Sequence, residues 1–450
     1  MVKLKRLKIY PSLQILLGFI GVILIGTFLL SLPISNTSCE WLNFIDSMFT
    51  STSAVCVTGL IVVDTATQFT LFGQIIILLL IQIGGLGIVA LTSLFFLMLK
   101  KKISLNGRLT LKESLNKETT QGVVKFIVKV IVITFVIEFV GMLLLLYSTI
   151  TYSGSFWTGL YYAIFMSISS FCNAGFDVLG SGAFMSLNSF ASSITMLLPI
   201  MMLVVLGGIG FVVIADGFTK MRTKQHAKVV LIMTVILVLF GAILFAILEW
   251  NNPNTLGNMS TDNKILNSFF QSITTRTAGI ATLDQGLLTG GSLAITIILR
   301  FIGGAPNSTA GGIKITTFFI LLLFIFKSGN ESGDIRLKDR RIGRKIILKT
   351  LKIFFFTIIA TIIGVILISI FEQGSFSLTE IIFECVSAIS TVGLTMGITP
   401  LLSVASKCVI MFLMFTGRVG ILTIVIAITT KKEDKINNEI EYANTDIMVG

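Results

Sequence analysis

Four glycines, spread over the length of the chain, stand in the same local setting. Each follows a phenylalanine by ten residues and is itself followed by a bulky apolar residue. The glycines are Gly59, Gly175, Gly279 and Gly393, and the phenylalanines are Phe49, Phe165, Phe269 and Phe383. Because glycine adopts backbone angles closed to other residues, the carbonyl groups around it can all point one way. Such carbonyl groups, gathered on one axis, can replace the water shell of a dehydrated cation.

The short strings that end at these glycines are therefore the predicted ligands, through their backbone carbonyl groups. They contain no acidic residue, which disfavours coordination of a divalent cation by carboxylates. The predicted filter residues are Cys56, Val57, Thr58, Gly59, Cys172, Asn173, Ala174, Gly175, Arg276, Thr277, Ala278, Gly279, Ser390, Thr391, Val392 and Gly393.

A second glycine-containing break follows each of these glycines inside a long apolar run. The four breaks read GGLG from Gly84, GGIG from Gly207, GGAP from Gly303 and GRVG from Gly417. The third continues as ten small, polar or helix-breaking residues, which do not easily extend a helix. Because non-helical backbone at membrane depth must border a water- or ion-filled path, this stretch is predicted to line the pore. The family resemblance that the motifs carry implies that it closes the path as a gate. A flexible kink without a gating function is the alternative.

Two basic residues belong to this candidate gate, Arg418 in the fourth break and Lys314 just after the third. A charge at membrane depth costs about 2.5–3.5 kcal/mol on insertion scales and usually faces the protein interior. Arg418 would repel cations, tie down loop carbonyl groups, or do both, and Lys314 would act similarly or extend toward the cytoplasm. The predicted gate residues are Gly303, Gly304, Ala305, Pro306, Asn307, Ser308, Thr309, Ala310, Gly311, Gly312, Lys314 and Arg418.

The elements that must position these residues are membrane spans. The 450 residues are 54% hydrophobic and 12% charged, about half the charged fraction of soluble domains. Most of the 34 Lys and Arg residues fall in five clusters, each at the end of an apolar run: 3–8, 100–117, 220–228, 327–352 and 431–435. The positive-inside rule places these clusters and both termini in the cytoplasm. Basic residues divided in this way argue against nucleic-acid binding, which needs one continuous face.

The intervals between clusters are longer than two spans, which need about 40 residues. Each interval is predicted to hold an outgoing span (12–33, 121–148, 228–249, 346–371), a short re-entrant helix (43–55, 156–171, 264–275, 378–389) and a returning span (69–99, 192–217, 290–326, 404–430). The first apolar run is interpreted as a retained span rather than a signal peptide. The predicted fold is an all-α membrane protein of four M1–P-loop–M2 repeats in a pseudo-fourfold arrangement around one ion pore. The repeats are 1–118, 119–225, 226–343 with the gate loop, and 344–450 with the C-terminal tail.

Little in the sequence supports catalysis. The five cysteines are scattered without a CxxC spacing, the only histidine is His226, and no GKS/T phosphate loop is present. We therefore expect no enzymatic activity and no cofactor in this chain. We expect the membrane-depth charges Glu138 and Arg300 to pair within the bundle, and Arg276 to hold filter-loop backbone by hydrogen bonds.

Taken together, the motifs resemble the Trk/Ktr/HKT superfamily of potassium transporters, above all the membrane subunit of bacterial Ktr systems. The strings VTGLIVVDT from Val57, NAGF from Asn173, RTAG from Arg276 and TVGLTMG from Thr391 look like its four filter loops, and IQIGGLG from Ile81 also fits. The resemblance covers essentially the whole chain. It implies potassium uptake across the plasma membrane, through one gated pore in each protomer of a homodimer, with sodium dependence left open.

The resemblance also bears on selectivity. In that family a serine in place of the first glycine is associated with sodium permeation, so Gly59 implies selectivity for potassium. Cys56 and Cys172 depart from the Thr or Asn expected at those positions. A backbone carbonyl is the same in cysteine, so the departure bears on the strength of the site rather than on its selectivity.

A partner is implied as well. A cytoplasmic ring of nucleotide-binding regulatory subunits, similar to KtrA or KtrC, would bind the nucleotide that this chain has no domain to bind. The basic segments 100–117 and 220–228 are its expected docking surface, or contact anionic lipid headgroups. The tail 431–450 would bridge the dimer or be disordered. Two alternatives remain: a sodium-permeable member of the same scaffold, and an alternating-access secondary cation transporter, which twofold rather than fourfold repetition would favour.

Overall fold

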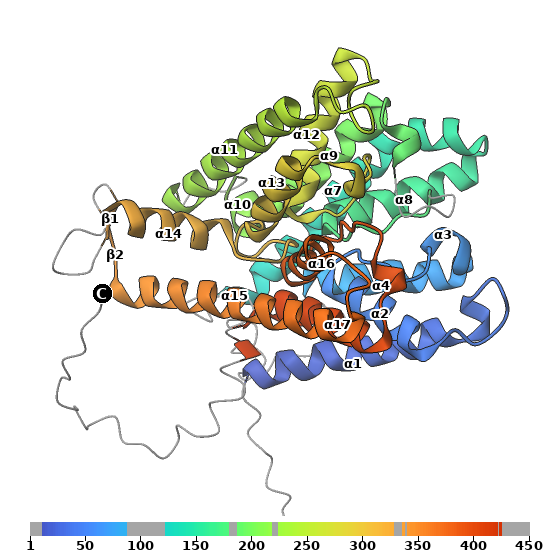
Figure 1. Cartoon of the computed structure of the whole chain (residues 1–450), viewed down its shortest axis with the longest axis horizontal. Helices are drawn as coiled ribbons and strands as arrows, with labels where there is room; N and C mark the ends of the chain where they lie inside the picture. The colour runs from blue at the N-terminus through green and yellow to red at the C-terminus, as the bar shows by residue number, and fades with distance from the viewer. Residues whose placement is uncertain are drawn as a thin grey trace, which may run out of the picture.

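The computed structural model describes residues 11–87, 122–179, 187–217, 224–327, 335–337, 340–421 and 423–424. Across these ranges the chain is almost entirely helical (Figure 1). The strands found there are β1 (Ile335–Leu337) and β2 (Arg340–Ile342), an antiparallel pair that links the end of α14 (Ile315–Lys327) to the start of α15 (Arg344–Glu372). The prediction of an all-α membrane fold is confirmed, while the exact repeat boundaries stay predictions.

Four helices of the described part are long and apolar enough to cross a membrane. They are α1 (Pro11–Ser31), α7 (Val123–Ser153), α11 (Lys224–Glu249) and α15 (Arg344–Glu372), and they match the four predicted outgoing spans. Large apolar side chains such as Phe28, Phe139 and Ile243 are more than half exposed on them. A helix that is apolar on its exposed face fits contact with lipid rather than with water.

Four shorter helices correspond to the predicted re-entrant segments: α2 (Phe44–Cys56), α8 (Phe156–Cys172), α12 (Thr261–Thr277) and α16 (Leu378–Ser390). At 13 to 17 residues and about 1.5 Å per residue, they are too short to cross a hydrocarbon layer of about 30 Å. Phe49, Phe165 and Phe383 are completely buried on three of them. On α12 Phe270 takes the buried place, and Phe269, which stands at the ten-residue spacing, is half-buried.

The helices of the returning spans end or break at the second glycine motif, where the sequence predicts a break. The resulting helices are α4 (Leu71–Leu86), α9 (Ile194–Ile209) with α10 (Phe211–Gly217), α13 (Gly290–Phe301) with α14 (Ile315–Lys327), and α17 (Val404–Val419). The breaks fall at Gly87, Gly210 and Gly420, whose φ angles of +87°, +95° and +89° suit glycine alone. The third motif has Pro306 in the corresponding place, and proline cannot adopt a positive φ. An irregular loop therefore follows Phe301 and continues to Ile315.

Short helical turns complete the links between the longer helices. They are η1 (Pro33–Ser35), α3 (Thr65–Gln68), η2 (Asn188–Phe190), η3 (Gln285–Leu287) and η4 (Thr399–Leu401). The last four each precede a returning helix. Asp64 caps α3 through the Ala66 N–H, and Asp284 caps η3 through the Gly286 N–H. These carboxylates therefore start local turns, as capping residues do.

The repeats are joined in a closed ring. The returning helix of each repeat packs on the short helix of the next: α4 on α8, α9 on α12, α13 on α16, and α17 on α2. The last contact brings the end of the described chain beside its beginning (Figure 1). There Lys407 of α17 forms an ion pair of 2.9 Å with Asp46 of α2, and the two side chains are only 13% and 21% exposed. This cyclic order places the four re-entrant helices around one centre.

The Asp46–Lys407 pair should contribute to closure of the ring. We expect Asp46→Asn to lower the free energy of unfolding in detergent by about 1–2 kcal/mol, between the values for exposed ion pairs and for buried charged hydrogen bonds. Asp262→Asn is the matched control, because Asp262 stands in the first turn of α12 but is exposed. An equal loss in both variants would attribute the effect to charge at a helix start and not to the ion pair.

Candidate ion pathway

Each re-entrant helix ends just before its glycine. Cys56, Cys172 and Ser390 are the last residues of α2, α8 and α16, and all three are buried. The next residues, Val57, Asn173 and Thr391, take left-handed angles with φ of 57°, 58° and 49°. This conformation, uncommon outside glycine, turns the chain from the helix toward the glycine two positions later. The predicted filter strings therefore begin at helix ends and continue as turned backbone.

The third repeat reaches its glycine differently. Arg276 and Thr277 are still helical, and Ala278 follows with an ordinary φ of −97°. The helix α12 thus runs one residue closer to its glycine than the other three do. The same offset of one residue explains why Phe270, and not Phe269, occupies the buried position.

The four glycines meet in one ring. Their φ angles are +88°, +72°, +74° and +95° for Gly59, Gly175, Gly279 and Gly393. A Cβ atom added at Gly59 would lie 2.5 Å from the Ala174 carbonyl oxygen and 2.9 Å from the Gly175 Cα. The same relation continues around the ring, from Gly175 to Ala278, from Gly279 to Val392, and from Gly393 back to Thr58. The backbone of all four strings therefore converges at a point where a side chain would not fit.

Hydroxyl groups of the re-entrant helices hold the strings from behind. The Ser387 hydroxyl accepts from the Gly393 N–H at 3.1 Å and donates to the Leu394 carbonyl at 2.8 Å. Ser53 accepts from Gly59, Ser169 donates to Phe176, and Thr274 donates to Ile280. These residues were missed in the sequence. The signal was a serine six residues before three of the glycines, shifted to a threonine five residues before the fourth.

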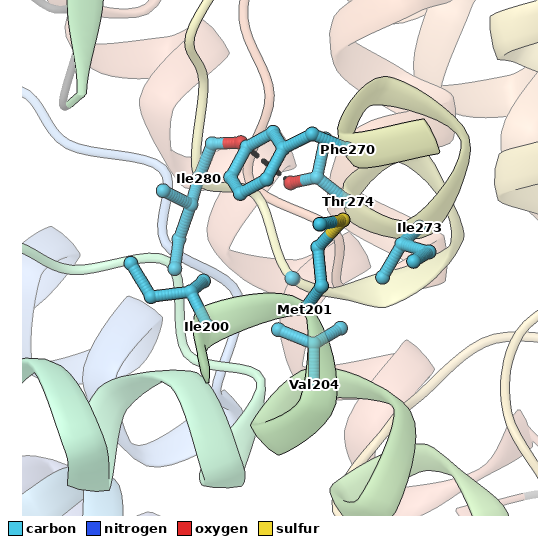
Figure 2. A pocket seen from close by; sticks show the side chains of 8 residues that line it. Ile200, Met201, Val204, Phe270, Ile273, Thr274 and Ile280 are labelled. Carbon is cyan, nitrogen blue, oxygen red and sulfur yellow. Dashed lines mark hydrogen bonds between the residues drawn. The ribbon is translucent and has the colours of Figure 1, made fainter. Parts of the chain in front are cut away.

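Apolar packing closes the wall outside the third string. Figure 2 shows Ile200, Met201 and Val204 of α9 facing Phe270 and Ile273 of α12, with the Thr274–Ile280 hydrogen bond beside them. This contact leaves no room for a water molecule. The turned backbone is therefore separated from the exposed outer surface, as its polar groups require at membrane depth.

The predicted gate loop lies against the ends of the re-entrant helices. The Ala305 N–H donates to the Gly208 carbonyl, and the Asn307 carbonyl accepts from the Phe211 N–H, each at 2.8 Å. The Thr309 hydroxyl donates to the Phe171 carbonyl at 3.1 Å and lies 3.0 Å from the Asn173 amide. The loop is thus fastened to the second repeat immediately beside the filter string.

The fourth repeat holds the same loop from another side. A Cβ atom at Gly311 would collide with the Thr391 hydroxyl, and one at Gly312 would lie 3.4 Å from the Ser390 carbonyl oxygen. The Thr391 hydroxyl is buried without a hydrogen-bond partner among the described residues. The loop therefore sits directly before the filter strings of two repeats, on the side where the re-entrant helices end.

Arg418 joins three repeats at this point. Its guanidinium donates to the Thr309 carbonyl of the gate loop and to the Gly84 and Gly85 carbonyls of α4, the last at 3.1 Å. Lys314 donates to the Ala310 carbonyl at 2.5 Å, inside the loop, so its ammonium group does not extend toward an aqueous surface. A planar guanidinium with several donors suits such a multiple contact.

The other membrane-depth charges have separate surroundings. Gln82 donates to the Glu138 carboxylate at 3.1 Å, so Glu138 is paired within the bundle as predicted. Arg300 donates to the Phe383 carbonyl at 3.3 Å. The prediction for Arg276 is wrong: it donates to the Thr234 carbonyl of α11 at 3.4 Å rather than to its filter loop. A helical Arg276 faces away from the string, because α12 is one residue longer.

A cavity of about 280 Å³ opens on the other side of the glycines. It is lined by the loops after the third and fourth glycines: Gly279, Ala281, Leu283, Asp284, Gln285, Gly393, Leu394, Thr395, Met396 and Gly397. The filter strings therefore lie between this cavity, the vestibule, and the predicted gate loop. The predicted docking segment 100–117, part of 220–228 and the tail 431–450 lie outside the described residues.

Comparisons with known proteins agree with this architecture. A family model described as TrkH, cation transport protein, matches residues 17–440. The potassium/sodium uptake protein NtpJ of Enterococcus hirae is 38% identical over 456 residues, covering 100% of this chain and 99% of that protein. The Ktr system potassium uptake protein B of Bacillus subtilis (strain 168) is 38% identical over 451 residues, covering 99% and 98%.

A solved structure shares the fold. The crystal structure of the potassium transporter TrkH from Vibrio parahaemolyticus superimposes with a TM-score of 0.71 and 17% sequence identity, covering 92% of this chain and 85% of that chain. Sequence and structure therefore agree over nearly the whole length. The chain belongs to the TrkH family of cation transport proteins.

Proposed function

We propose that this chain is the ion-translocating membrane subunit of a Ktr-type potassium uptake system and works as a gated, channel-like pore. The observation that carries the proposal is the closed ring of four glycines, each facing the residue before the next glycine. The names of the relatives, which refer to potassium or to potassium and sodium, support it. The chain needs no catalytic group for this role.

In this proposal the carbonyl groups of Thr58, Ala174, Ala278 and Val392 replace water around potassium. Uncharged carbonyl groups hold a monovalent cation firmly enough to enter and weakly enough to leave. Uptake is driven by the membrane potential, which is worth about 2.3 kcal/mol per elementary charge for each 100 mV. Loss of the gate-loop contacts would open the path between the filter and the cytoplasm.

Several features of the assembly belong to the same proposal. The chain forms a homodimer in the plasma membrane with both termini in the cytoplasm, and a nucleotide-binding ring similar to KtrA or KtrC controls the gate. Since the gate loop is fastened to α9, α10 and Arg418 of α17, movement of these helix ends would pass directly to it. Two relatives are named as protein B and protein D of a Ktr system, and these names, which imply further components, support a multi-component assembly.

The second candidate is a sodium-permeable pore on the same scaffold. The name of NtpJ, a potassium/sodium uptake protein, favours it. Flux of potassium, rubidium and sodium into liposomes containing the purified chain separates the two. Saturable potassium and rubidium flux with little sodium flux is expected. Equal sodium and potassium flux would favour the second candidate, and no flux even with the regulatory ring and nucleotide would favour alternating access.

Gly59→Ser tests the filter. At a φ of +88° and with the Ala174 carbonyl 2.5 Å from the new Cβ, the ring must shift to admit a side chain. We expect the potassium-to-sodium flux ratio to fall about tenfold, which corresponds to about 1.4 kcal/mol of lost discrimination. Gly21→Ser on α1 is the control, because nothing lies within 4 Å of a Cβ there. An unaltered ratio in folded Gly59→Ser protein would place the filter elsewhere.

Arg418 tests the gate and separates two mechanisms. If its hydrogen bonds hold the loop, both Arg418→Gln and Arg418→Lys should raise flux in the absence of the ring, because lysine cannot reach three carbonyl groups at once. We expect this result, with an increase of about tenfold, the size of one charged hydrogen bond. An increase in Arg418→Gln alone would instead identify a charge barrier.

The loop itself provides the stronger form of this test. Deletion of Asn307–Ala310 should raise flux further, because it removes the Thr309 carbonyl that Arg418 holds. Arg344→Gln, at an exposed basic residue at the start of α15, is the control for lost charge. Unchanged flux in a correctly folded deletion variant would contradict a gating role.

A further inference from the structure

A completely buried carboxylate lies on the re-entrant helix of the fourth repeat. Glu384 is 0% exposed and accepts hydrogen bonds from the Thr395 and Thr399 hydroxyl groups, the latter at 3.0 Å. The Met396 N–H also donates to this carboxylate. The two hydroxyl groups lie 2.9 Å apart, and the Gly397 N–H donates to Thr395 at 2.9 Å. One side chain thus fastens the loop that follows Gly393.

Glu384 and Ser387 contact consecutive parts of the same backbone segment. Glu384 precedes Ser387 by three residues, so both lie on one face of α16. Ser387 binds Gly393 and Leu394, and Glu384 binds the next part of the loop through Thr395, Met396 and Thr399. Backbone from the filter glycine to η4 is therefore held by a single helix face.

The third repeat carries an uncharged counterpart. Gln271 precedes Thr274 by three residues and donates to the Gln285 side chain at 2.7 Å. Gln285 and Thr399 are both the sixth residue after their glycine, and Gln271 corresponds to Glu384 once α12 is shifted by one residue. The first and second repeats have Thr50, which bonds within its own helix, and Met166 in this place. Among the described residues, this side-chain clasp is found in the third and fourth repeats.

The loops of the same two repeats line the vestibule. Thr395, Met396 and Gln285 belong both to the clasped loops and to the wall of the 280 Å³ cavity. Behind the fourth clasp, the Arg300 guanidinium stacks on the Phe383 ring, 3.6 Å from its centre, and is near enough to attract the Glu384 charge. An opposite charge reduces the penalty of burying a carboxylate. Glu384 is therefore built into the structure as a supported charge beside the filter.

We propose that Glu384 is a positioning residue for ion selection, which fixes the direction of the carbonyl groups around Gly393 by clasping the loop beyond them. This inference rests on the proposed potassium pore and assigns part of its selectivity to a residue that does not touch the ion. A filter discriminates between cations through the number and stiffness of its carbonyl ligands. Without the clasp, the carbonyl groups of the fourth string can move inward and coordinate a smaller ion.

Glu384→Gln is the first test, because it keeps the shape and removes one acceptor oxygen and the charge. An amide NH₂ group then faces donors at Thr395, Thr399 or Met396. We expect the potassium-to-sodium flux ratio in liposomes to fall about tenfold, while total cation flux is retained. Thr395→Val, which removes one hydroxyl group without changing volume, should shift the ratio in the same direction by less.

A rescue variant uses the clasp of the third repeat. Glu384→Gln combined with Thr399→Gln supplies the amide pair that Gln271 and Gln285 form, and should restore most of the lost selectivity. Glu380→Gln is the matched control: it removes the same charge one turn earlier on α16, where the half-buried carboxylate accepts hydrogen bonds from Ser377 and not from the loop. It should leave the ratio unchanged.

The outcomes are distinct. A selective wild type with reduced ratios in Glu384→Gln and Thr395→Val, and recovery in the double variant, would support the clasp. A selective wild type with unchanged ratios in folded Glu384→Gln and Thr395→Val would overturn the clasp and leave the proposed pore intact. Equal falls in Glu384→Gln and Glu380→Gln would replace the clasp with a general effect of charge. A wild type without selectivity would overturn the proposed function and this inference with it.

Discussion

The whole structure depends on giving partners to non-helical backbone at membrane depth. A peptide group without a hydrogen bond in such a place costs several kcal/mol, and this chain places four turned strings and one long loop there. The strings are held by hydroxyl groups on their own helices, at Ser53, Ser169, Thr274 and Ser387. Where each string meets the next repeat, glycine is required by close backbone approach and by positive φ. A closed ring of four is the arrangement that satisfies every string in the same way.

The loop that we propose as a gate follows from one departure from this symmetry. The returning helices of the first, second and fourth repeats break at a glycine with positive φ and can resume or end at once. The third repeat has Pro306 in that position. Without an intrahelical partner, the backbone of the loop takes its hydrogen bonds from neighbouring repeats, at Gly207, Gly208 and Phe211, and from Arg418. The loop is thereby bound to the elements whose movement would release it. Such a gate needs no separate domain, because the neighbouring repeats already supply hydrogen-bond partners for the loop.

The sequence predicted the frame better than its attachments. The phenylalanine–glycine spacing and the charge clusters located the outgoing and re-entrant helices, because both reflect strong constraints of length and backbone angle. The extra residue at the end of α12 was not visible in the sequence. Phe269 and Phe270 are adjacent, and the sequence does not show which of the two is buried. That offset also reversed the prediction for Arg276, which faces α11. The supporting hydroxyl groups were missed because serine and threonine are common, and their role depends on which side of a helix faces the string. The bonds of Arg418 join residues more than 300 positions apart, so no local pattern could indicate them.

A single chain with four unequal repeats can adjust each quadrant of its pore separately, which four copies of one subunit cannot do. The second contact behind the filter is made by a carboxylate in the fourth repeat and by an amide in the third. The described residues of the first two repeats show no contact of this form. If pore stiffness were needed equally on every side, Thr50 and Met166 would be unexpected at the corresponding positions. Among the described residues, the two clasped loops line the vestibule, so the wall that the clasps hold is also the wall of the vestibule. Selectivity in such a pore need not be shared equally among four glycines: it can be concentrated where the carbonyl groups are least free to move.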